Sequence, residues 1–261
     1  MTIRTETVEA LHAVGRHLVA GQGPEPVSAA TVAEAMAAFG AVDGPAAGLL
    51  RERLTGLRPT ARWWEDELAD DVPVRGEWWV CDATDGAVQY LSGLPHWAVT
   101  ATLLADGEPV LSVVHGPLQG LTYDAVRGGG ARLNGRPVAP LPRTLAASVA
   151  ATAQPPLVAG DPVALRRAGE SLSAVLPRVL AVRNLGPTAL QVAHVGSGHL
   201  GAFWEYGRDA TNLLPGALVA REAGAVVTDA RGRPWTPGAD GFVAAAPSLH
   251  RDLLDALSRV A

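Results

Sequence analysis

The strongest constraint on the fold is a change in hydrophobic period near Trp78. Before this point, apolar residues recur at helical spacing, as Leu11, Val14 and Leu18 do in the first segment. Such spacing places them on one face of an amphipathic helix, which ends at Gly21. After Trp78, short apolar runs alternate with turn residues, which is typical of strands. The chain is therefore expected to begin with helices and to continue into a sheet.

Two further helices are expected before the sheet. Ser28 can cap a helix that runs through Met36, because a serine side chain accepts a hydrogen bond from the first helical turn. Pro45 can open another helix through Leu54, since proline is well tolerated at the first helical position. The sequence thus predicts three separate helices ahead of the first long strand.

The middle of the chain has the pattern of an antiparallel meander. Turn pairs such as Asp106-Gly107 and Asn134-Gly135 separate short apolar runs, and such pairs favour tight hairpins. The first strand is expected to stop at Asp82, where a polar turn begins. The expected strands are Glu77–Cys81, Trp97–Leu104, Pro109–His115 and Leu121–Val126.

The second half alternates between strand and helix patterns, which together with the first half predicts a layered α/β assembly. We expect one domain over residues 1–261, with subregions 1–140 and 141–261. The expected strands are Val149–Thr152, Val179–Val182, Gly201–Glu205, Ala225–Thr228 and Gly241–Ala245. The expected helices are Val163–Val175, Thr188–Val195, Leu213–Ala223 and a closing helix whose apolar face begins at Leu249.

Composition excludes several classes of chemistry. All 21 basic residues are arginine, so the chain has neither a Schiff-base lysine nor the lysine of a P-loop. A single cysteine, Cys81, excludes thiolate metal clusters and disulfide frameworks. The net charge of −5 and the lack of a basic run argue against nucleic acid as a partner. No apolar stretch reaches the length of about 18 residues that spans a membrane, and charges interrupt the first apolar segment, so a cytoplasmic protein is expected.

The densest polar cluster lies at the end of the first predicted strand. It runs from Cys81 through Asp82, Thr84 and Asp85 to Gly86. Two carboxylates three positions apart can converge on one cation, and oxygen ligands suit Mg²⁺. The glycine allows the backbone to turn successive N–H groups toward an anion. An ordinary turn rich in aspartate is the alternative, and spacing alone does not separate the two.

The polar cluster resembles a signature of the inositol monophosphatase family. That family has Asp-Pro-(Ile/Leu)-Asp-Gly-Thr after an apolar strand, and this chain has Asp82-Ala83-Thr84-Asp85-Gly86-Ala87 after Trp79-Val80-Cys81. The resemblance extends over nearly the whole chain and implies an α/β fold, a layered αβαβα sandwich of the inositol monophosphatase and fructose-1,6-bisphosphatase type. Further segments that resemble the family, in the same order, are residues 93–99, 107–110, 128–137 and 216–224.

The resemblance implies a phosphomonoesterase that uses two or three Mg²⁺ ions. Asp82 would bridge two of the ions and Asp85 would bind one of them. The backbone carbonyl of Thr84 would be a further metal ligand. The backbone amides of Gly86 and Ala87 would hold the phosphate of the substrate.

The resemblance also assigns roles to acidic residues outside the cluster. One carboxylate of the segment Glu65, Asp66 and Glu67 would complete the first metal site. Asp66 lies 23 residues after Asp43, the family's usual distance between its water-activating Asp and its metal-binding Glu, whereas Glu67 is chemically the closer match. Glu205 falls where the family has an acid that contacts the ring hydroxyls of the substrate.

Two departures from the family pattern bear on activity. The family's Thr after Asp-Gly, which orients the attacking water together with an Asp, is Ala87 here, so Asp43 loses its partner. In the second family signature, Trp-Asp-x-Ala-(Ala/Gly), Thr211 replaces the Trp and Asn212 replaces the Asp. Asn212 would offer an oxygen to Mg²⁺ without a charge, or would cap a helix instead. Asp209, grouped with the substrate-binding residues, lies three positions earlier and could restore the charge.

The function implied by the resemblance is Mg²⁺-dependent hydrolysis of a small phosphate monoester by a homodimer. An inositol phosphate or a similar polyol or sugar phosphate is the expected substrate. The alternative is a catalytically impaired or repurposed member that binds a polyol or phosphate ligand or serves a partner, because Ala87 and Asn212 depart from the family. A third alternative, hydrolysis of nucleotide 3′-phosphates, needs a base-binding pocket that the sequence does not reveal.

Overall fold

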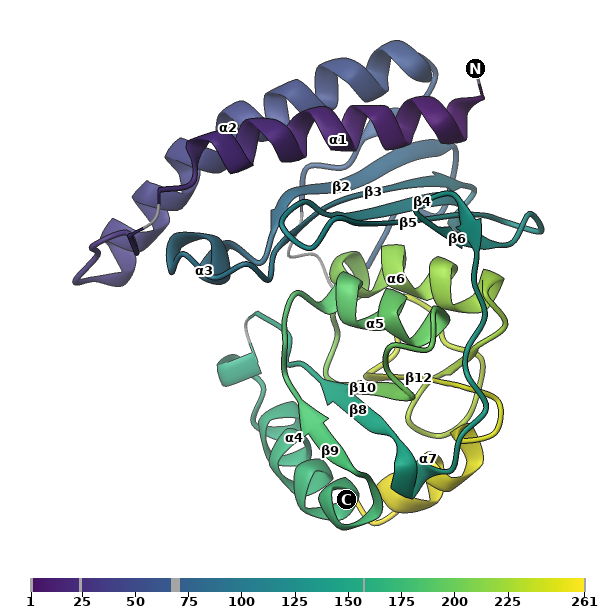
Figure 1. The fold of residues 1–261 in the computed structure, drawn as a ribbon. Helices are drawn as coiled ribbons and strands as arrows, with labels where there is room; N and C mark the ends of the chain where they lie inside the picture. The colour runs from purple at the N-terminus through teal and green to yellow at the C-terminus, as the bar shows by residue number, and fades with distance from the viewer. Residues whose placement is uncertain (1, 24, 67–70, 157, 261) are drawn as a thin grey trace.

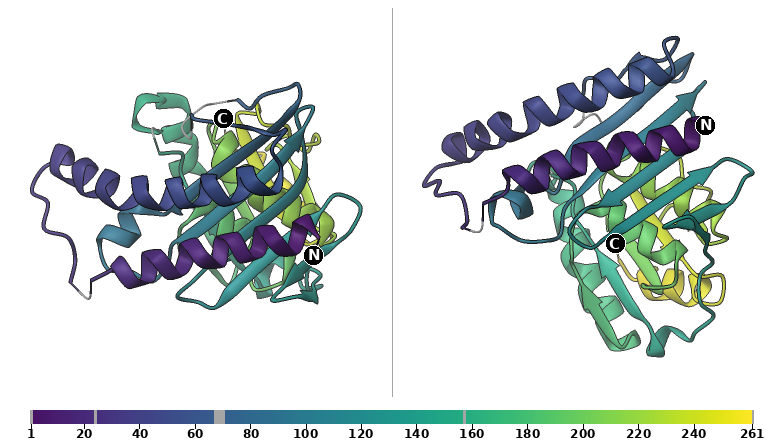
Figure 2. Two further views of the ribbon diagram at one scale, coloured as in Figure 1. Left: turned by 90° about the horizontal axis from the view of Figure 1, so that it is seen from above. Right: turned by 45° about the horizontal axis from the view of Figure 1, so that its top comes forward.

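Two long helices open the chain. The computed structural model describes residues 2–23, 25–66, 71–156 and 158–260. Helices α1 (Ile3–Gly21) and α2 (Val32–Leu57) lie side by side across one face of the first sheet (Figure 2). The predicted apolar face of α1, with Leu11, Val14 and Leu18, is buried there. Neither these helices nor any other described helix is both long and apolar enough to cross a membrane.

The predicted helix start at Ser28 is wrong, because Thr31 caps α2 instead. The hydroxyl of Thr31 accepts a hydrogen bond 3.2 Å long from the N–H of Glu34. In return, the carboxylate of Glu34 accepts a hydrogen bond of 3.2 Å from the N–H of Thr31. This reciprocal pair is a capping box, which satisfies two backbone donors that a single Ser could not.

The predicted break before Pro45 is also wrong, because α2 runs through this proline without interruption. Proline inside a helix removes one backbone hydrogen bond. The residues that follow it keep the helix in place, since Ala46, Leu50 and Leu54 are fully buried. Packing of an apolar face contributes more to helix stability in a protein than local propensity does.

The first sheet confirms the predicted antiparallel meander. Strand β1 is parallel to β2, and the other neighbouring pairs in this sheet are antiparallel. Asn134 and Gly135 have φ values of 49° and 77° and form the tight turn between the last two strands. In chain order the strands are β1 (Arg62–Trp63), β2 (Glu77–Asp85), β3 (Ala98–Ala105), β4 (Glu108–Gly116), β5 (Leu121–Val126), β6 (Ala131–Leu133) and β7 (Arg136–Pro137).

Strand β2 extends further than predicted. It continues through Asp82 to Asp85, with a shift of register between these two aspartates. An irregularity of this kind redirects side chains at the end of a strand. A short helix, α3 (Ala87–Leu91), begins directly after Gly86, whose φ is 96°. A Cβ atom at Gly86 would lie 3.2 Å from neighbouring backbone atoms, so both conformation and space require glycine there.

The second half alternates as predicted, and its elements lie close to their predicted ranges. Its sheet has the strand order β11-β12-β10-β8-β9. The strands are β8 (Val149–Thr152), β9 (Ala181–Arg183), β10 (Ala202–Tyr206), β11 (Val226–Thr228) and β12 (Gly241–Ala245). The helices are α4 (Pro162–Val175), α5 (Thr188–Gly196), α6 (Ala210–Glu222) and α7 (His250–Leu257).

The helices and the two sheets stack as alternating layers (Figure 1). Helices α1 and α2 cover the outer face of the first sheet, α5 and α6 lie between the sheets, and α4 and α7 cover the outer face of the second sheet. Buried apolar clusters in the described residues fill the interfaces between these layers. The structure thus confirms the predicted αβαβα sandwich.

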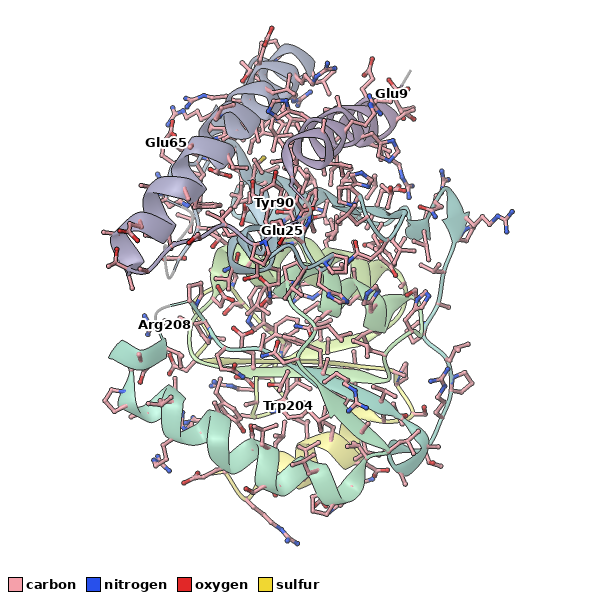
Figure 3. The ribbon with its side chains drawn as sticks, turned by 60° about the vertical axis from the view of Figure 1, so that its left-hand side comes forward. Glu9, Glu25, Glu65, Tyr90, Trp204 and Arg208 are labelled. Carbon is pink, nitrogen blue, oxygen red and sulfur yellow. The ribbon has the colours of Figure 1, made fainter. Side chains whose placement is uncertain are left out.

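Trp204 on β10 illustrates the packing of the lower layers (Figure 3). Its ring is fully buried between the second sheet and α4. Its indole N–H donates a hydrogen bond of 2.8 Å to Oγ of Ser171 on α4. A buried tryptophan needs such a partner for its single donor, and the bond fixes α4 against the sheet.

Candidate metal and phosphate site

Asp82 and Asp85 lie at the end of β2, where the strand pairing shifts. Asp85 is only 6% exposed, and Asp82 is half-buried. Burial raises the pKa of Asp82 well above its ordinary value, and the negative charge of Asp85 raises it further. The backbone N–H of Thr84, which donates to Oδ1 of Asp82 over 2.8 Å, opposes both effects. Two neighbouring carboxylates do not readily carry negative charge at the same time unless a cation compensates that charge.

Two further carboxylates approach Asp82 from other elements. Asp43 lies on α2, and Asp209 is the residue at which α6 begins. The negative charges of both raise the pKa of Asp82. The fold therefore brings carboxylates from an outer helix and from the second half of the chain near enough for their charges to act on Asp82.

Asp43 lies on α2, which packs against β2, and the side chain of Thr84 on β2 acts on its carboxylate. Burial raises the pKa of Asp43, and the side-chain hydroxyl of Thr84 acts in the opposite direction. Oδ1 of Asp43 and Oγ1 of Thr84 are both buried, and neither completes a hydrogen bond within the described residues. Unsatisfied buried oxygens are rare in folded proteins, and they mark places where water or a ligand binds.

Asn212 lies in the first turn of α6 and contacts Asp209 directly. Its Nδ2 donates a hydrogen bond of 2.7 Å to Oδ1 of Asp209. The Asp209 side chain is buried and does not cap the helix. The amide therefore orients a neighbouring carboxylate, so the start of α6 offers a carboxylate group although Asn212 itself has none.

A small cavity of about 10 Å³ lies between the first sheet, near the end of β2, and the first turn of α6. Its polar lining comes from Asp82 and Thr100 on the first sheet, and from Thr211 and Asn212 on α6. This volume is near the smallest that holds a single water molecule. The sequence did not point to Thr100, although the hairpin register that pairs it with Asp82 could have done so.

Glu205 on β10 is 1% exposed and lies beside Asp209. Burial raises its pKa well above the ordinary value, and the charge of Asp209 and a hydrogen bond with it add to this effect. The hydroxyl of Thr188 on α5 opposes the rise. Glu205 thus belongs to the same group of interacting acids, through Asp209.

The acidic segment before β2 occupies a different position. Glu65 pairs with Arg51 at 2.8 Å beside α2, and both side chains are largely exposed (Figure 3). Asp66 is exposed, and Glu67 lies outside the described residues. The described members of the segment are not among the carboxylates that raise the pKa of Asp82. The ligand expected from this segment therefore stays a prediction.

Gly86 and Ala87 stand at the start of α3, next to Asp85. The N–H of Tyr90 donates to the carbonyl of Gly86 over 3.0 Å, which makes Gly86 the first capping residue. The first N–H groups of a helix have no partner within the helix and can bind an anion. Ala87 offers its amide there but no hydroxyl group.

The donor set suits Mg²⁺ in its chemistry. Asp82, Asp85 and Asp209 supply carboxylate oxygens, and hard divalent cations take oxygen ligands. In the ranges that the structure describes, no three His, Cys, Asp or Glu side chains already surround one ion position. Binding at Asp82 therefore needs side-chain movement, or backbone carbonyls and water as further ligands, which Mg²⁺ commonly keeps.

Comparison with known proteins agrees with this geometry. The model of the inositol monophosphatase family matches residues 10–260. The chain is 35% identical over 196 residues to an inositol-1-monophosphatase of Rhizobium meliloti, covering 73% of this chain and 71% of that protein. It is 30% identical over 182 residues to a Nus factor SuhB of Pasteurella multocida, covering 68% and 66%. The crystal structure of the extragenic suppressor protein suhB from Bartonella henselae aligns over 99% of both chains, with a TM-score of 0.82 and 27% identity. The protein belongs to the inositol monophosphatase family.

Proposed function

We propose that this protein hydrolyses a small phosphate monoester with Mg²⁺, and that its substrate is an inositol phosphate or a similar polyol or sugar phosphate. The observation that carries the proposal is that Asp85, Asp43 and Asp209 lie near enough to Asp82 for their negative charges to raise its pKa. Carboxylates from three separate elements repel one another in a folded protein, and a bound cation would remove that cost. Membership of the family and a relative named inositol-1-monophosphatase support the same reaction.

Asp82, Asp85 and the backbone carbonyl of Thr84 would hold the metal. Asp209 would supply the negative charge that Asn212 lacks, and the 2.7 Å hydrogen bond from Asn212 would keep it oriented. When bound, Mg²⁺ polarises phosphoryl oxygens and stabilises the charge of the leaving oxygen. Without lysine anywhere in the chain, the site has to take most of its positive charge from such ions.

The protein's own groups would position the substrate and accept the proton. The amides of Gly86 and Ala87 would bind the phosphate at the start of α3. Asp43 would accept a proton from the attacking water, and its raised pKa makes it a better base. Glu205 is the candidate for contact with hydroxyl groups of a polyol. We also propose a homodimer, which light scattering of the purified protein tests.

Phosphate release from a panel of monoesters tests the proposed reaction. We expect release that requires Mg²⁺, falls with added Li⁺ and disappears in Asp85→Asn. The matched control is Asp255→Asn, because Asp255 forms an exposed ion pair with Arg178 and lies on α7, which covers the outer face of the second sheet (Figure 1). Wild-type protein that binds Mg²⁺ and releases no phosphate from any monoester would contradict the proposal.

A binding protein without turnover is the second candidate function. Ala87 and Asn212 favour it, because both replace groups that the family resemblance places in catalysis. One relative of the chain is named as a Nus factor rather than as a phosphatase. Calorimetry with Mg²⁺ separates the candidates: two or three bound ions support hydrolysis, and no bound ion supports a binding role.

A further inference from the structure

A hydroxyl group lies beside Asp43 even though Ala87 carries none. Thr84 on β2 is 1% exposed, and its Oγ1 is completely buried. Helix α2 packs against β2, and the Thr84 hydroxyl lies near enough to the Asp43 carboxylate to favour its charged form. The hydroxyl that Ala87 lacks is thus present three positions earlier, on the strand rather than on α3.

One buried oxygen of Thr84 and one of Asp43 have unused hydrogen-bonding capacity. In the part of the chain that the structure describes, neither Oγ1 of Thr84 nor Oδ1 of Asp43 forms a hydrogen bond of good geometry. Buried polar groups are almost always satisfied by protein or by ordered water. A water molecule that joins the hydroxyl to the carboxylate would satisfy both oxygens, because it can donate two hydrogen bonds and accept two.

We propose that Thr84 supplies the hydroxyl that positions the attacking water for Asp43, in place of the missing hydroxyl at Ala87. This inference rests on the proposed phosphatase function. Thr84 lies between Asp82 and Asp85 on β2, and the charge of Asp43 acts on Asp82, so a water held between Thr84 and Asp43 would lie near the proposed metal position. The backbone carbonyl of Thr84 would then bind the metal, and its side chain would hold the water.

The reaction step follows from the donor and acceptor properties of the three groups. The water donates a hydrogen bond to Oδ1 of Asp43 and accepts one from the hydroxyl of Thr84. A lone pair of the water oxygen forms the new bond to phosphorus, while the bond to the leaving oxygen breaks with its electron pair. The water proton that faces Asp43 passes to its carboxylate, while the hydroxyl of Thr84 keeps its own proton and holds the water in place. A solvent water protonates the leaving oxygen.

Three substitutions separate the hydroxyl from the rest of the residue. Thr84→Val keeps the shape and the backbone carbonyl and removes only the hydroxyl, whereas Thr84→Ser keeps the hydroxyl. Thr84→Val combined with Ala87→Thr moves the hydroxyl to the position that the family uses. The matched control is Thr102→Val, which removes a buried hydroxyl of β3 that is bonded to Ser112.

We expect Thr84→Val to lower kcat by about 100-fold, the lower range for losing positioned proton transfer. The Mg²⁺ affinity by calorimetry, KM and the unfolding temperature should stay at wild-type values. Thr84→Ser should retain most of kcat, and adding Ala87→Thr to Thr84→Val should recover most of the lost activity. Full activity in Thr84→Val, or equal losses in Thr84→Val and Thr84→Ser, would overturn the inference.

A crystal structure that resolves bound water gives a readout independent of turnover. We expect a water bonded to both Thr84 Oγ1 and Asp43 in the wild-type protein and in Thr84→Ser, and no such water in Thr84→Val. If that water is present and the wild-type protein releases no phosphate, the proposed function fails while the water site stands. If no water lies between the two side chains of the wild-type protein, the inference fails whatever the activity.

Discussion

The two sides of the site obtain their negative charge in different ways. On the β2 side, Asp82 and Asp85 come from one continuous run, and the irregular end of the strand places them together. On the α6 side, the carboxylate is that of Asp209, and Nδ2 of Asn212 donates a hydrogen bond of 2.7 Å to its Oδ1. The β2 side keeps the family's carboxylates, whereas the α6 side has an amide at the usual position and an acid one turn earlier. We propose that the site retains its charge while the residue that carries it changes.

The largest effect is expected on the β2 side. Asp82→Asn should lower kcat for phosphate release by about 1000-fold, because it removes a proposed ligand of a metal ion that would contribute several kcal/mol of charge stabilisation. The same substitution should raise the unfolding temperature of the metal-free protein, since the pKa of Asp82 is raised by burial and by its acidic neighbours. Activity assays and thermal unfolding of the same preparation measure both effects. A loss of activity together with a loss of stability would point to a damaged fold instead.

An intermediate effect is expected on the α6 side. Asp209→Asn should weaken Mg²⁺ binding by about 10-fold to 100-fold, the range typical of groups that support a metal site. Asn212→Asp alone should gain little, because two adjacent carboxylates in this buried turn repel each other. Calorimetry with Mg²⁺ measures both variants.

The double variant Asp209→Asn with Asn212→Asp sharpens the comparison, because it moves the charge back to the position that the family uses. We expect it to recover most of the Mg²⁺ affinity that Asp209→Asn loses. If Asp209→Asn binds Mg²⁺ as the wild-type protein does, the α6 side does not depend on Asp209 and the comparison fails.

The smallest effect is expected at Glu205, and it concerns stability. Its pKa is raised above the ordinary value of 4.5, so the folded protein binds more protons than the unfolded chain in the window above pH 4.5. Stability should therefore fall as pH rises through this window. Glu205→Gln can donate to Asp209 without carrying a charge, so it should reduce this fall and raise the unfolding temperature at pH 7 by roughly 2–4 °C. Thermal unfolding of both proteins between pH 4 and pH 8 measures this difference. An unfolding temperature that falls with pH as steeply in Glu205→Gln as in the wild-type protein would contradict the raised pKa of Glu205.

The β2 side could be predicted from sequence because its signals are local. The Asp82 to Gly86 run, the strand before it and the turn pairs of the meander all lie within short segments, and their residues have few alternative structures. Helix α2 shows the limit of local rules, because burial of Leu50 and Leu54 outweighs the break that Pro45 predicts. The predicted strand end at Asp82 falls too early for a similar reason, since pairing with β3 continues to Asp85.

The contacts that define the α6 side and the water site could not be read from sequence. Thr84 meets Asp43 across 41 positions, and Asp209 acts on Asp82 across the interface of two sheets that are far apart in the chain. No rule based on sequence spacing predicts contacts between residues so far apart in the chain. The hydrogen bond from Asn212 to Asp209 is local, yet side-chain direction in the first turn of a helix decides whether the pair meets.

Metal occupancy tests most directly whether the two sides of the site act together. Anomalous scattering from crystals grown with Mn²⁺ locates each ion and its ligands. We predict ions bound to Asp82 and Asp85, at least one of which is also coordinated by Asp209. Ions bound only by the β2 side, with Asp209 still hydrogen-bonded to Asn212 and distant from them, would contradict the account, as would a site that binds no ion.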